Sequence, residues 1–209
     1  MNFGGSITLV FGPMFSGKTT ELIRLCDRQQ LAGRKVLVIK YSKDTRYTAN
    51  DEVSTHVGHT LPAIPTDKLF SVSDAALDAE VIGIDEGQFF PDIVQFADDM
   101  ANAGKHVIVA ALDGTFRRDP FPSRVIDLLP RAEHVTKLSA VCHICGRNAP
   151  FSRRITADTD VEVIGGADMY VAVCRHCFHA DVTEGLKVDP KSRSPVRNML
   201  TVPEPPRSW

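Results

Sequence analysis

The sequence lacks the features of a membrane or exported protein. No apolar stretch is long enough to cross a bilayer, and residues 1–5 (MNFGG) have neither the charged head nor the apolar core of a signal peptide. We therefore expect no membrane partner and a cytoplasmic location. Because disulfides are rare in that compartment, the five cysteines are expected to serve as thiols or metal ligands.

A long basic run is also missing, and the formal net charge is −2. A protein that binds a nucleic-acid backbone usually carries a concentrated positive surface, so we expect no nucleic-acid partner. The sequence contains no internal repeat. Its 209 residues leave room for one domain of full size, or for one domain and a small satellite.

Short apolar runs alternate with helical patterns over the first half of the chain. Expected strands cover Ile7–Phe11, Lys35–Lys40, Val81–Asp85 and His106–Leu112, and expected helices cover Thr19–Ala32, Ser73–Ala79 and Pro91–Ala103. Gly33 is a stop signal for the first helix, and Ser73 is a candidate cap for the second. Residues 41–66 are polar and are expected to form loops. The alternation predicts an α/β fold with a mostly parallel sheet and helices on both faces.

The pattern changes near residue 140. Helical periodicity disappears there, and cysteine pairs flank short β-rich pieces such as Val161–Ile164. We expect a large α/β domain over residues 1–139, a small β-rich lobe over 140–184 and a C-terminal tail over 185–209. The proline-rich end of the tail has the composition of an exposed extension.

Residues 12–19 (GPMFSGKT) match the pattern G-x-x-x-x-G-K-[ST] directly after a predicted strand. In this pattern the backbone curls so that successive N–H groups face phosphate oxygens, and the next helix adds its positive end. Lys18 would reach the β- and γ-phosphates of ATP, and the Thr19 hydroxyl would ligate Mg²⁺. A glycine turn with a chance lysine is the alternative, which the full match disfavours. The loop narrows the fold class to a P-loop (RecA-like) sheet.

The strand that starts at Val81 ends in two carboxylates, Asp85 and Glu86. Asp85 would hold Mg²⁺ at the mouth of the phosphate loop, usually through water. Glu86 would accept a proton from the attacking nucleophile, which is water in an ATPase and a substrate hydroxyl in a kinase. Alternatively, the pair only caps a turn before Gly87. The residues expected to contact ATP or Mg²⁺ are Gly12, Pro13, Met14, Phe15, Ser16, Gly17, Lys18, Thr19, Asp85, Glu86, Gly87 and Gln88.

The cysteines of the small lobe form two C-x-x-C pairs. Cys142 and Cys145 make the first pair, and Cys174 and Cys177 make the second. Each pair can supply two corners of a tetrahedron, which suits a structural Zn²⁺ with no open position. Redox pairs or buried thiols are the alternative, and His143, His176 or His179 could replace a ligand. Cys26, on the apolar side of the first helix, is expected to be a core residue.

These motifs together resemble a known family. The segments GPMFSGKTTEL (12–22), DTR (44–46), DEGQFF (85–90), ALDGTFRRDPF (111–121), KLSAVCHICG (137–146) and VIGGADMYVAVCRHC (163–177) are similar to thymidine kinases of the type II, zinc-containing class, in the same order. The resemblance implies transfer of the γ-phosphate of ATP to the 5′-hydroxyl of thymidine, and of deoxyuridine. It also implies a homotetramer, feedback inhibition by thymidine triphosphate, and a lobe whose loop closes over the nucleoside.

The resemblance assigns roles to individual residues. Glu86 falls at the position of the proton acceptor, and Arg46 falls near the transferring phosphate, where a cation stabilises developing charge. The nucleoside contacts that it implies are Met14, Phe89, Ser152, Val161, Val163 and Tyr170. Ser152 stands where related enzymes often carry a threonine near the thymine methyl group, so the smaller residue could weaken discrimination against deoxyuridine.

Two other classes of function remain to be distinguished. A zinc-bearing P-loop ATPase that acts on nucleic acid would want a basic groove and usually a longer chain, and neither is present. A regulatory nucleotide-binding protein with little turnover would not need the Asp85–Glu86 pair. Assay of the protein with ATP and a panel of nucleosides separates both from a nucleoside kinase.

Overall fold

A six-stranded parallel sheet lies at the centre of the fold in the computed structural model, which describes residues 4–44, 52–54, 60–156 and 165–180. The strand order is β5-β2-β6-β7-β1-β8, and every neighbouring pair is parallel. The strands are β1 (Ser6–Phe11), β2 (Val36–Tyr41), β5 (Ile64–Thr66), β6 (Val81–Ile84), β7 (His106–Ala111) and β8 (His134–Lys137). The predicted α/β class and the mostly parallel sheet are confirmed.

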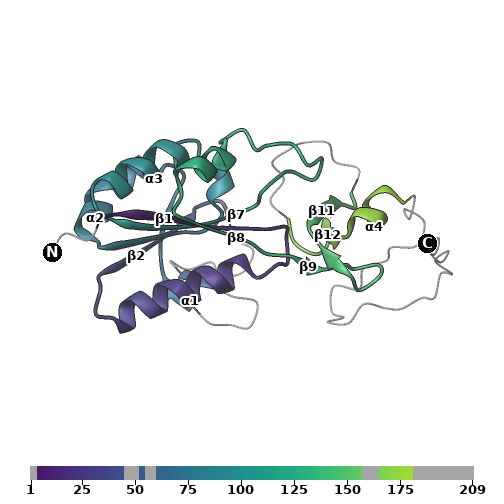
Figure 1. Cartoon of the computed structure of the whole chain (residues 1–209), viewed down its shortest axis with the longest axis horizontal. Helices are drawn as coiled ribbons and strands as arrows, with labels where there is room; N and C mark the ends of the chain where they lie inside the picture. Colours follow the sequence, from purple (N-terminus) through teal and green to yellow (C-terminus); the bar gives the residue numbers. More distant parts are fainter. Residues whose placement is uncertain (1–3, 45–51, 55–59, 157–164, 181–209) are drawn as a thin grey trace.

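Helices cover both faces of the sheet. Helix α1 (Lys18–Leu31) lies on one face, and α2 (Ser73–Asp78) and α3 (Ile93–Asn102) lie on the other (Figure 1). Along β1, Leu9 packs into the core beneath α3 and Val10 packs into the core beneath α1. Two apolar cores therefore hold the sheet, as continuous apolar strands require. The predicted core position of Cys26 is confirmed, since its side chain has no exposed surface.

Close packing of α1 on the sheet depends on a glycine in β6. A Cβ atom on Gly83 would lie 2.7 Å from the Sγ of Cys26. Only glycine allows the helix to approach the strand so closely at this point. The packing fixes the helix that begins at the phosphate loop against the strand that leads to Asp85.

Two expectations about local structure were wrong. Residues 41–66 are not all loop, because β5 forms an edge of the central sheet and β3 (Glu52–Ser54) pairs antiparallel with β4 (Thr60–Pro62). Three-residue strands are too short to show a period of two in the sequence. Ser73 is not a helix cap: the 3₁₀ turn η1 (Leu69–Val72) continues directly into α2, and the Ser73 hydroxyl donates to the carbonyl of Phe70 at 2.8 Å.

The cysteine-containing segment forms small paired strands beyond one end of the sheet (Figure 1). Its elements are β9 (Ala140–Val141), β10 (Asn148–Ala149), β11 (Phe151–Arg154), β12 (Tyr170–Val173) and α4 (Arg175–His179). The β-rich character is as expected, but α4 shows that helix does not disappear after residue 140. The predicted strand at Val161–Ile164 and the tail from residue 185 lie outside the described residues.

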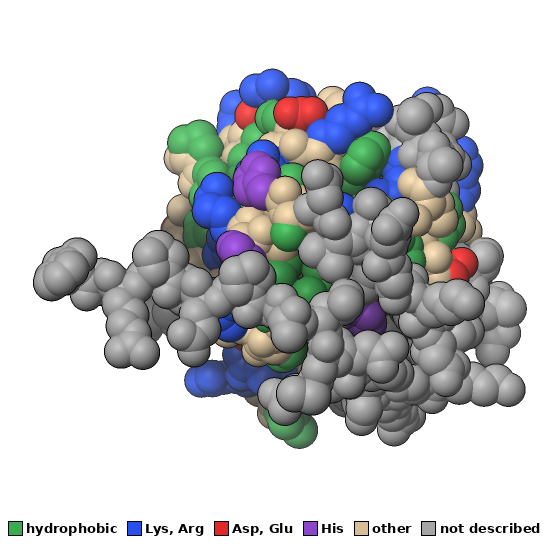
Figure 2. Space-filling model, turned by 90° about the vertical axis from the view of Figure 1, so that its right-hand side faces the viewer, with side chains coloured by type: hydrophobic (Ala, Val, Ile, Leu, Met, Phe, Trp, Pro, Cys, Tyr) green, Lys and Arg blue, Asp and Glu red, His purple; other side chains and the backbone are tan. Residues whose placement is uncertain are grey.

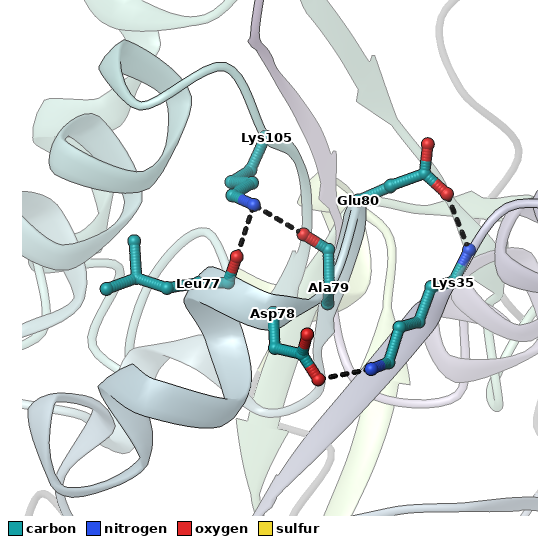
Figure 3. A network of polar contacts seen from close by, with 6 residues as sticks. All are labelled: Lys35, Leu77, Asp78, Ala79, Glu80 and Lys105. Carbon is teal, nitrogen blue, oxygen red and sulfur yellow. Dashed lines mark hydrogen bonds and ion pairs between the residues drawn. The ribbon is translucent and has the colours of Figure 1, made fainter.

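Polar contacts fix the opposite end of the sheet. Lys105, just before β7, donates from its side chain to the carbonyls of Leu77 and Ala79 (Figure 3). The backbone N–H of Lys35, just before β2, donates to the Glu80 carboxylate at 2.9 Å. These bonds tie the amino ends of three strands together, while the loops at the carboxyl ends carry the chemistry. Within the described part of the chain, no helix is both long enough and apolar enough to cross a membrane.

Candidate nucleotide site and metal centre

The phosphate loop runs from the end of β1 to the start of α1. Gly17 has φ +84° and Phe15 has φ +64°, so the backbone turns through left-handed conformations in which N–H groups face inward. A Cβ atom on Gly12 would lie 2.6 Å from the Ser16 Oγ, and no larger residue fits there. Lys18 is buried, and its ammonium donates to the carbonyl of Pro13 at 3.0 Å. The loop therefore has the curled form that binds phosphate groups.

Asp85 follows β6 and meets the start of α1. The Thr19 hydroxyl donates to both carboxylate oxygens of Asp85, at 3.1 and 3.2 Å. Burial raises the pKa of the Asp85 carboxyl to about 7, and the charge of Glu86 adds to the rise, while Lys18 and Thr19 lower it. A hydroxyl and a buried carboxylate in contact at the mouth of a phosphate loop supply the oxygen ligands that Mg²⁺ prefers.

Glu86 projects from a strained turn. Its φ of 53° is uncommon for a residue other than glycine, and such conformations cluster at active sites. The carboxylate accepts a hydrogen bond of 2.5 Å from the Gln88 side chain. Gln88 lies in the 3₁₀ turn η2 (Gly87–Phe89) and has no exposed surface. The second acid of the pair is therefore held beside the first.

The small lobe touches the phosphate loop through one buried hydrogen bond. The backbone N–H of Met14 donates to the Ser152 hydroxyl at 2.9 Å. Ser152 lies on β11, and both residues are largely buried. Two residues that the resemblance assigns to the nucleoside are thus brought together from distant parts of the sequence.

Aromatic side chains line the region between the sheet and the lobe. Phe89 packs against Tyr41 with ring centroids 5.2 Å apart and against Phe121 at 6.2 Å. Tyr170, at the start of β12, is buried, and its hydroxyl accepts a hydrogen bond from Arg154. Phe89 therefore packs against two aromatic rings, and the Tyr170 hydroxyl pairs with a cationic side chain.

Sequence reasoning missed Arg154 and Phe116 in this region. The Arg154 guanidinium lies 4.0 Å from the centroid of Phe116 and 5.1 Å from that of Tyr170. Arg154, on β11, therefore contacts both Phe116, in the loop after β7, and Tyr170, on β12. Nothing in the local sequence FSRR marks Arg154 as the buried arginine, because its partners come together only in the folded chain. Arg46, Val161 and Val163 lie outside the described residues.

The four cysteines of the C-x-x-C pairs meet in one cluster. The sulfur atoms of Cys142, Cys145, Cys174 and Cys177 all lie within 4.8 Å of one another, and those of Cys145 and Cys174 are 3.6 Å apart. Tetrahedral zinc with Zn–S bonds of about 2.3 Å requires sulfur atoms about 3.8 Å apart. The cluster therefore fits a structural metal ion such as zinc.

The thiols of the cluster must lose their protons to bind a metal ion, because only the thiolate is a ligand. Burial raises the pKa of Cys142 and of Cys177. Although partial burial would raise it, the pKa of Cys145 is lowered to about 6, chiefly by the hydrogen bond from the Arg147 guanidinium. A divalent ion stabilises thiolates that burial would otherwise keep protonated.

Basic side chains occur at the end of the molecule that carries the small lobe. In Figure 2, Lys and Arg side chains lie around the rim of this end, with few acidic ones among the described residues. A surface hollow of the lobe, of about 760 Å³, is lined by Arg147, Asn148, Pro150, Cys174, Arg175 and His176. It borders the cysteine cluster and contains none of the phosphate-loop residues.

The fold and the site define a class of protein. A phosphate loop, a Thr–Asp contact and an adjacent second acid at the carboxyl edge of a parallel sheet are the parts of a P-loop phosphoryl-transfer site. The four-cysteine lobe distinguishes it from P-loop proteins that consist of the sheet domain alone.

Comparison with known proteins narrows this class to one family. A family model described as thymidine kinase matches residues 5–178. The chain is 55% identical to "Thymidine kinase 1" of Dictyostelium discoideum over 89% of its own length and 83% of that protein. It is 57% identical to "Thymidine kinase, cytosolic" of Cricetulus griseus, over 83% and 73% of the two chains. It is 54% identical to "Thymidine kinase" of Myxoma virus (strain Lausanne), over 84% and 97%. The chain belongs to the thymidine kinase family.

Proposed function

We propose that this protein transfers the γ-phosphate of ATP to the 5′-hydroxyl of thymidine, and to that of deoxyuridine, in nucleotide salvage. The observation that carries the proposal is the contact of Thr19 with Asp85 beside Glu86 in a chain of this family. An acid next to the magnesium acid has an evident task in phosphoryl transfer, which is to accept the proton of the nucleophile.

Each residue of the site has its own role in the proposed reaction. Lys18 and Arg46 neutralise charge on the transferring phosphate, because phosphoryl transfer depends on positioning and charge more than on covalent chemistry. Glu86 orients the nucleoside hydroxyl and takes its proton late. Thr19 and Asp85 would hold Mg²⁺, which would neutralise charge on the phosphates. Gly12–Gly17 bind the phosphates through backbone N–H groups.

The lobe that follows the sheet binds the nucleoside. In this proposal Met14, Phe89, Ser152, Val161, Val163 and Tyr170 surround the base and sugar. The four cysteines would hold zinc, which would keep the lobe folded. The closed lobe would exclude water, so that ATP is not hydrolysed. The division that we propose is an ATP-binding domain at 1–139, a zinc-binding lobe at 140–184 and a tail at 185–209.

The remaining proposals concern the state of the enzyme in the cell. We propose a cytoplasmic homotetramer that thymidine triphosphate inhibits. These proposals rest on the resemblance, together with the relative from Cricetulus griseus, which is named "Thymidine kinase, cytosolic". No nucleic-acid or membrane partner is proposed.

Incubation of the purified protein with γ-labelled ATP and a panel of nucleosides tests the function. Labelled monophosphate should form from thymidine and deoxyuridine, and purine nucleosides should give little or none. Equal turnover of all nucleosides would contradict the substrate assignment. ATP hydrolysis that no nucleoside changes would instead identify an ATPase, with Glu86 acting on water.

A further inference from the structure

The side chain of Gln88 is polar and completely buried. Buried amide groups need hydrogen-bond partners, because an unpaired one loses its bonds to water and destabilises the fold. Gln88 follows Glu86 by two residues in the turn after β6, so its partners bear directly on the active site.

The partners fix which way the amide points. The backbone N–H of Leu112 donates to the Gln88 Oε1 at 2.9 Å. A backbone N–H can only donate, so the oxygen must face Leu112 and the nitrogen must face the other way. The nitrogen then donates to the Oε2 of Glu86 at 2.5 Å. Since Leu112 directly follows β7, the amide connects Glu86 to the rigid end of a neighbouring strand.

We propose that Gln88 is the positioning residue for the proton acceptor Glu86, an inference that rests on the proposed function. A donor aimed at the Glu86 Oε2 fixes the direction in which the carboxylate points, and a proton acceptor must be aimed at the hydroxyl that it serves. The bond also restricts rotation of a side chain whose backbone sits in a left-handed turn. Gln88 has no exposed surface, and its amide oxygen and nitrogen both bond protein atoms. It therefore acts through Glu86 and not by the direct contact with ATP or Mg²⁺ that is expected from the sequence.

Two substitutions separate the two hydrogen bonds. Gln88→Met keeps nearly the same length and loses both bonds. Gln88→Glu keeps an oxygen for Leu112 and puts a second carboxylate against Glu86. A matched control is Gln95→Met, because Gln95 is exposed on α3 and donates in the same way to Asp99 at 2.7 Å, away from the site.

For both Gln88 variants, kcat with thymidine should fall about 10- to 100-fold, the size expected for a lost hydrogen bond to a charged group. The KM for ATP should change by less than about threefold. Gln95→Met should leave both quantities unchanged. An unchanged kcat would overturn the inference, as would a rise in the KM for ATP alone, which would indicate direct contact.

A structural comparison independent of turnover completes the test. Crystal structures of the two variants without substrates show where the Glu86 carboxylate lies. It should leave its wild-type position in Gln88→Met and keep that position in Gln95→Met. An unmoved carboxylate in Gln88→Met overturns the inference even if the enzyme is a thymidine kinase. A wild-type protein that phosphorylates no nucleoside overturns the proposed function, while the position of the carboxylate still decides the role of Gln88.

Discussion

The hydroxyl of Ser152 accepts a hydrogen bond of 2.9 Å from the backbone N–H of Met14. Met14 belongs to the phosphate loop, and Ser152 belongs to a strand of the cysteine-containing lobe. The lobe is therefore joined to the ATP site by a buried backbone contact. Ser152 therefore accepts a hydrogen bond from the phosphate loop, in addition to the contact near the thymine methyl group that the resemblance assigns to it.

The first prediction distinguishes the hydrogen bond of Ser152 to Met14 from the expected role of Ser152 in discriminating thymidine from deoxyuridine. Ser152→Ala leaves the buried N–H of Met14 without its acceptor, which should cost about 1–3 kcal/mol of stability and raise the KM for ATP severalfold. Ser152→Thr keeps the hydroxyl and should retain near-normal ATP kinetics. Urea unfolding and steady-state kinetics measure both effects. If Ser152→Ala changes only the preference for thymidine over deoxyuridine, the bond to Met14 contributes nothing to ATP binding.

The second prediction concerns the two charged groups of the phosphate site. Glu86→Gln keeps the shape but cannot take a proton, so kcat should fall by about 10²–10⁴ with nearly intact ATP binding. Lys18→Ala should impair both ATP binding and turnover, because Lys18 contacts the phosphates in the ground state as well. Glu80→Gln is a matched control, since Glu80 lies at the opposite end of the sheet. Near-normal turnover of Glu86→Gln would exclude Glu86 as the base.

Much of the sheet was predictable because its central strands are continuous apolar runs. β1, β6 and β7 are largely buried, and such runs are read directly from composition. The edges were not predictable in the same way. All four residues of β8 are exposed, so HVTK carries no hydrophobic signal, and β5 has only three residues. Edge strands are fixed by pairing with a neighbour, which a sequence pattern does not contain.

The candidate site, like the sheet, was predictable from the sequence only in part. The phosphate loop, the acid pair and the cysteine pairs have local spacings that chemistry dictates, so the sequence alone identifies them. The bonds of Ser152 to Met14 and of Gln88 to Leu112 join residues that the sequence separates by 138 and 24 positions. Neither bond follows from a motif, because each depends on how the loops meet at the carboxyl edge of the folded sheet.

The third prediction concerns the metal. We expect one zinc per chain, bound at about 2.3 Å from each of the four sulfur atoms. Cys174 directly follows β12, which begins at Tyr170, and its sulfur caps α4 by accepting from the N–H of Cys177 at 3.5 Å. Cys174→Ser should therefore lower zinc content and raise the KM for thymidine more than it weakens ATP binding.

Replacement of the cysteine outside the cluster provides the control for this experiment. Cys26→Ala removes a core thiol and should lower stability, while zinc content stays at one per chain. Metal analysis of protein purified without chelators measures zinc directly. Absence of zinc, or a normal thymidine KM in Cys174→Ser, would show that the lobe is held in another way.

The last prediction uses the pKa of Asp85. Burial, with the charge of Glu86, raises it from 3.8 in the unfolded chain to about 7 in the folded protein. Between these values the folded state binds more protons than the unfolded state, so the free energy of unfolding must fall as pH rises. Asp85→Asn cannot ionise and loses this dependence. The stability of the wild type relative to Asp85→Asn should therefore decrease from roughly pH 4 to pH 7 and then level off.

Urea unfolding of both proteins across this range, without nucleotide or added magnesium, measures the difference. Chelators are omitted so that the cysteine cluster is undisturbed, and any protonation of its thiols cancels because both proteins share it. If the difference is flat or increases with pH, the Asp85 carboxyl is already ionised at low pH in the folded protein. The contact with Thr19 and the charge of Lys18 would then outweigh burial, and Asp85 would be ready to hold Mg²⁺ without first losing a proton.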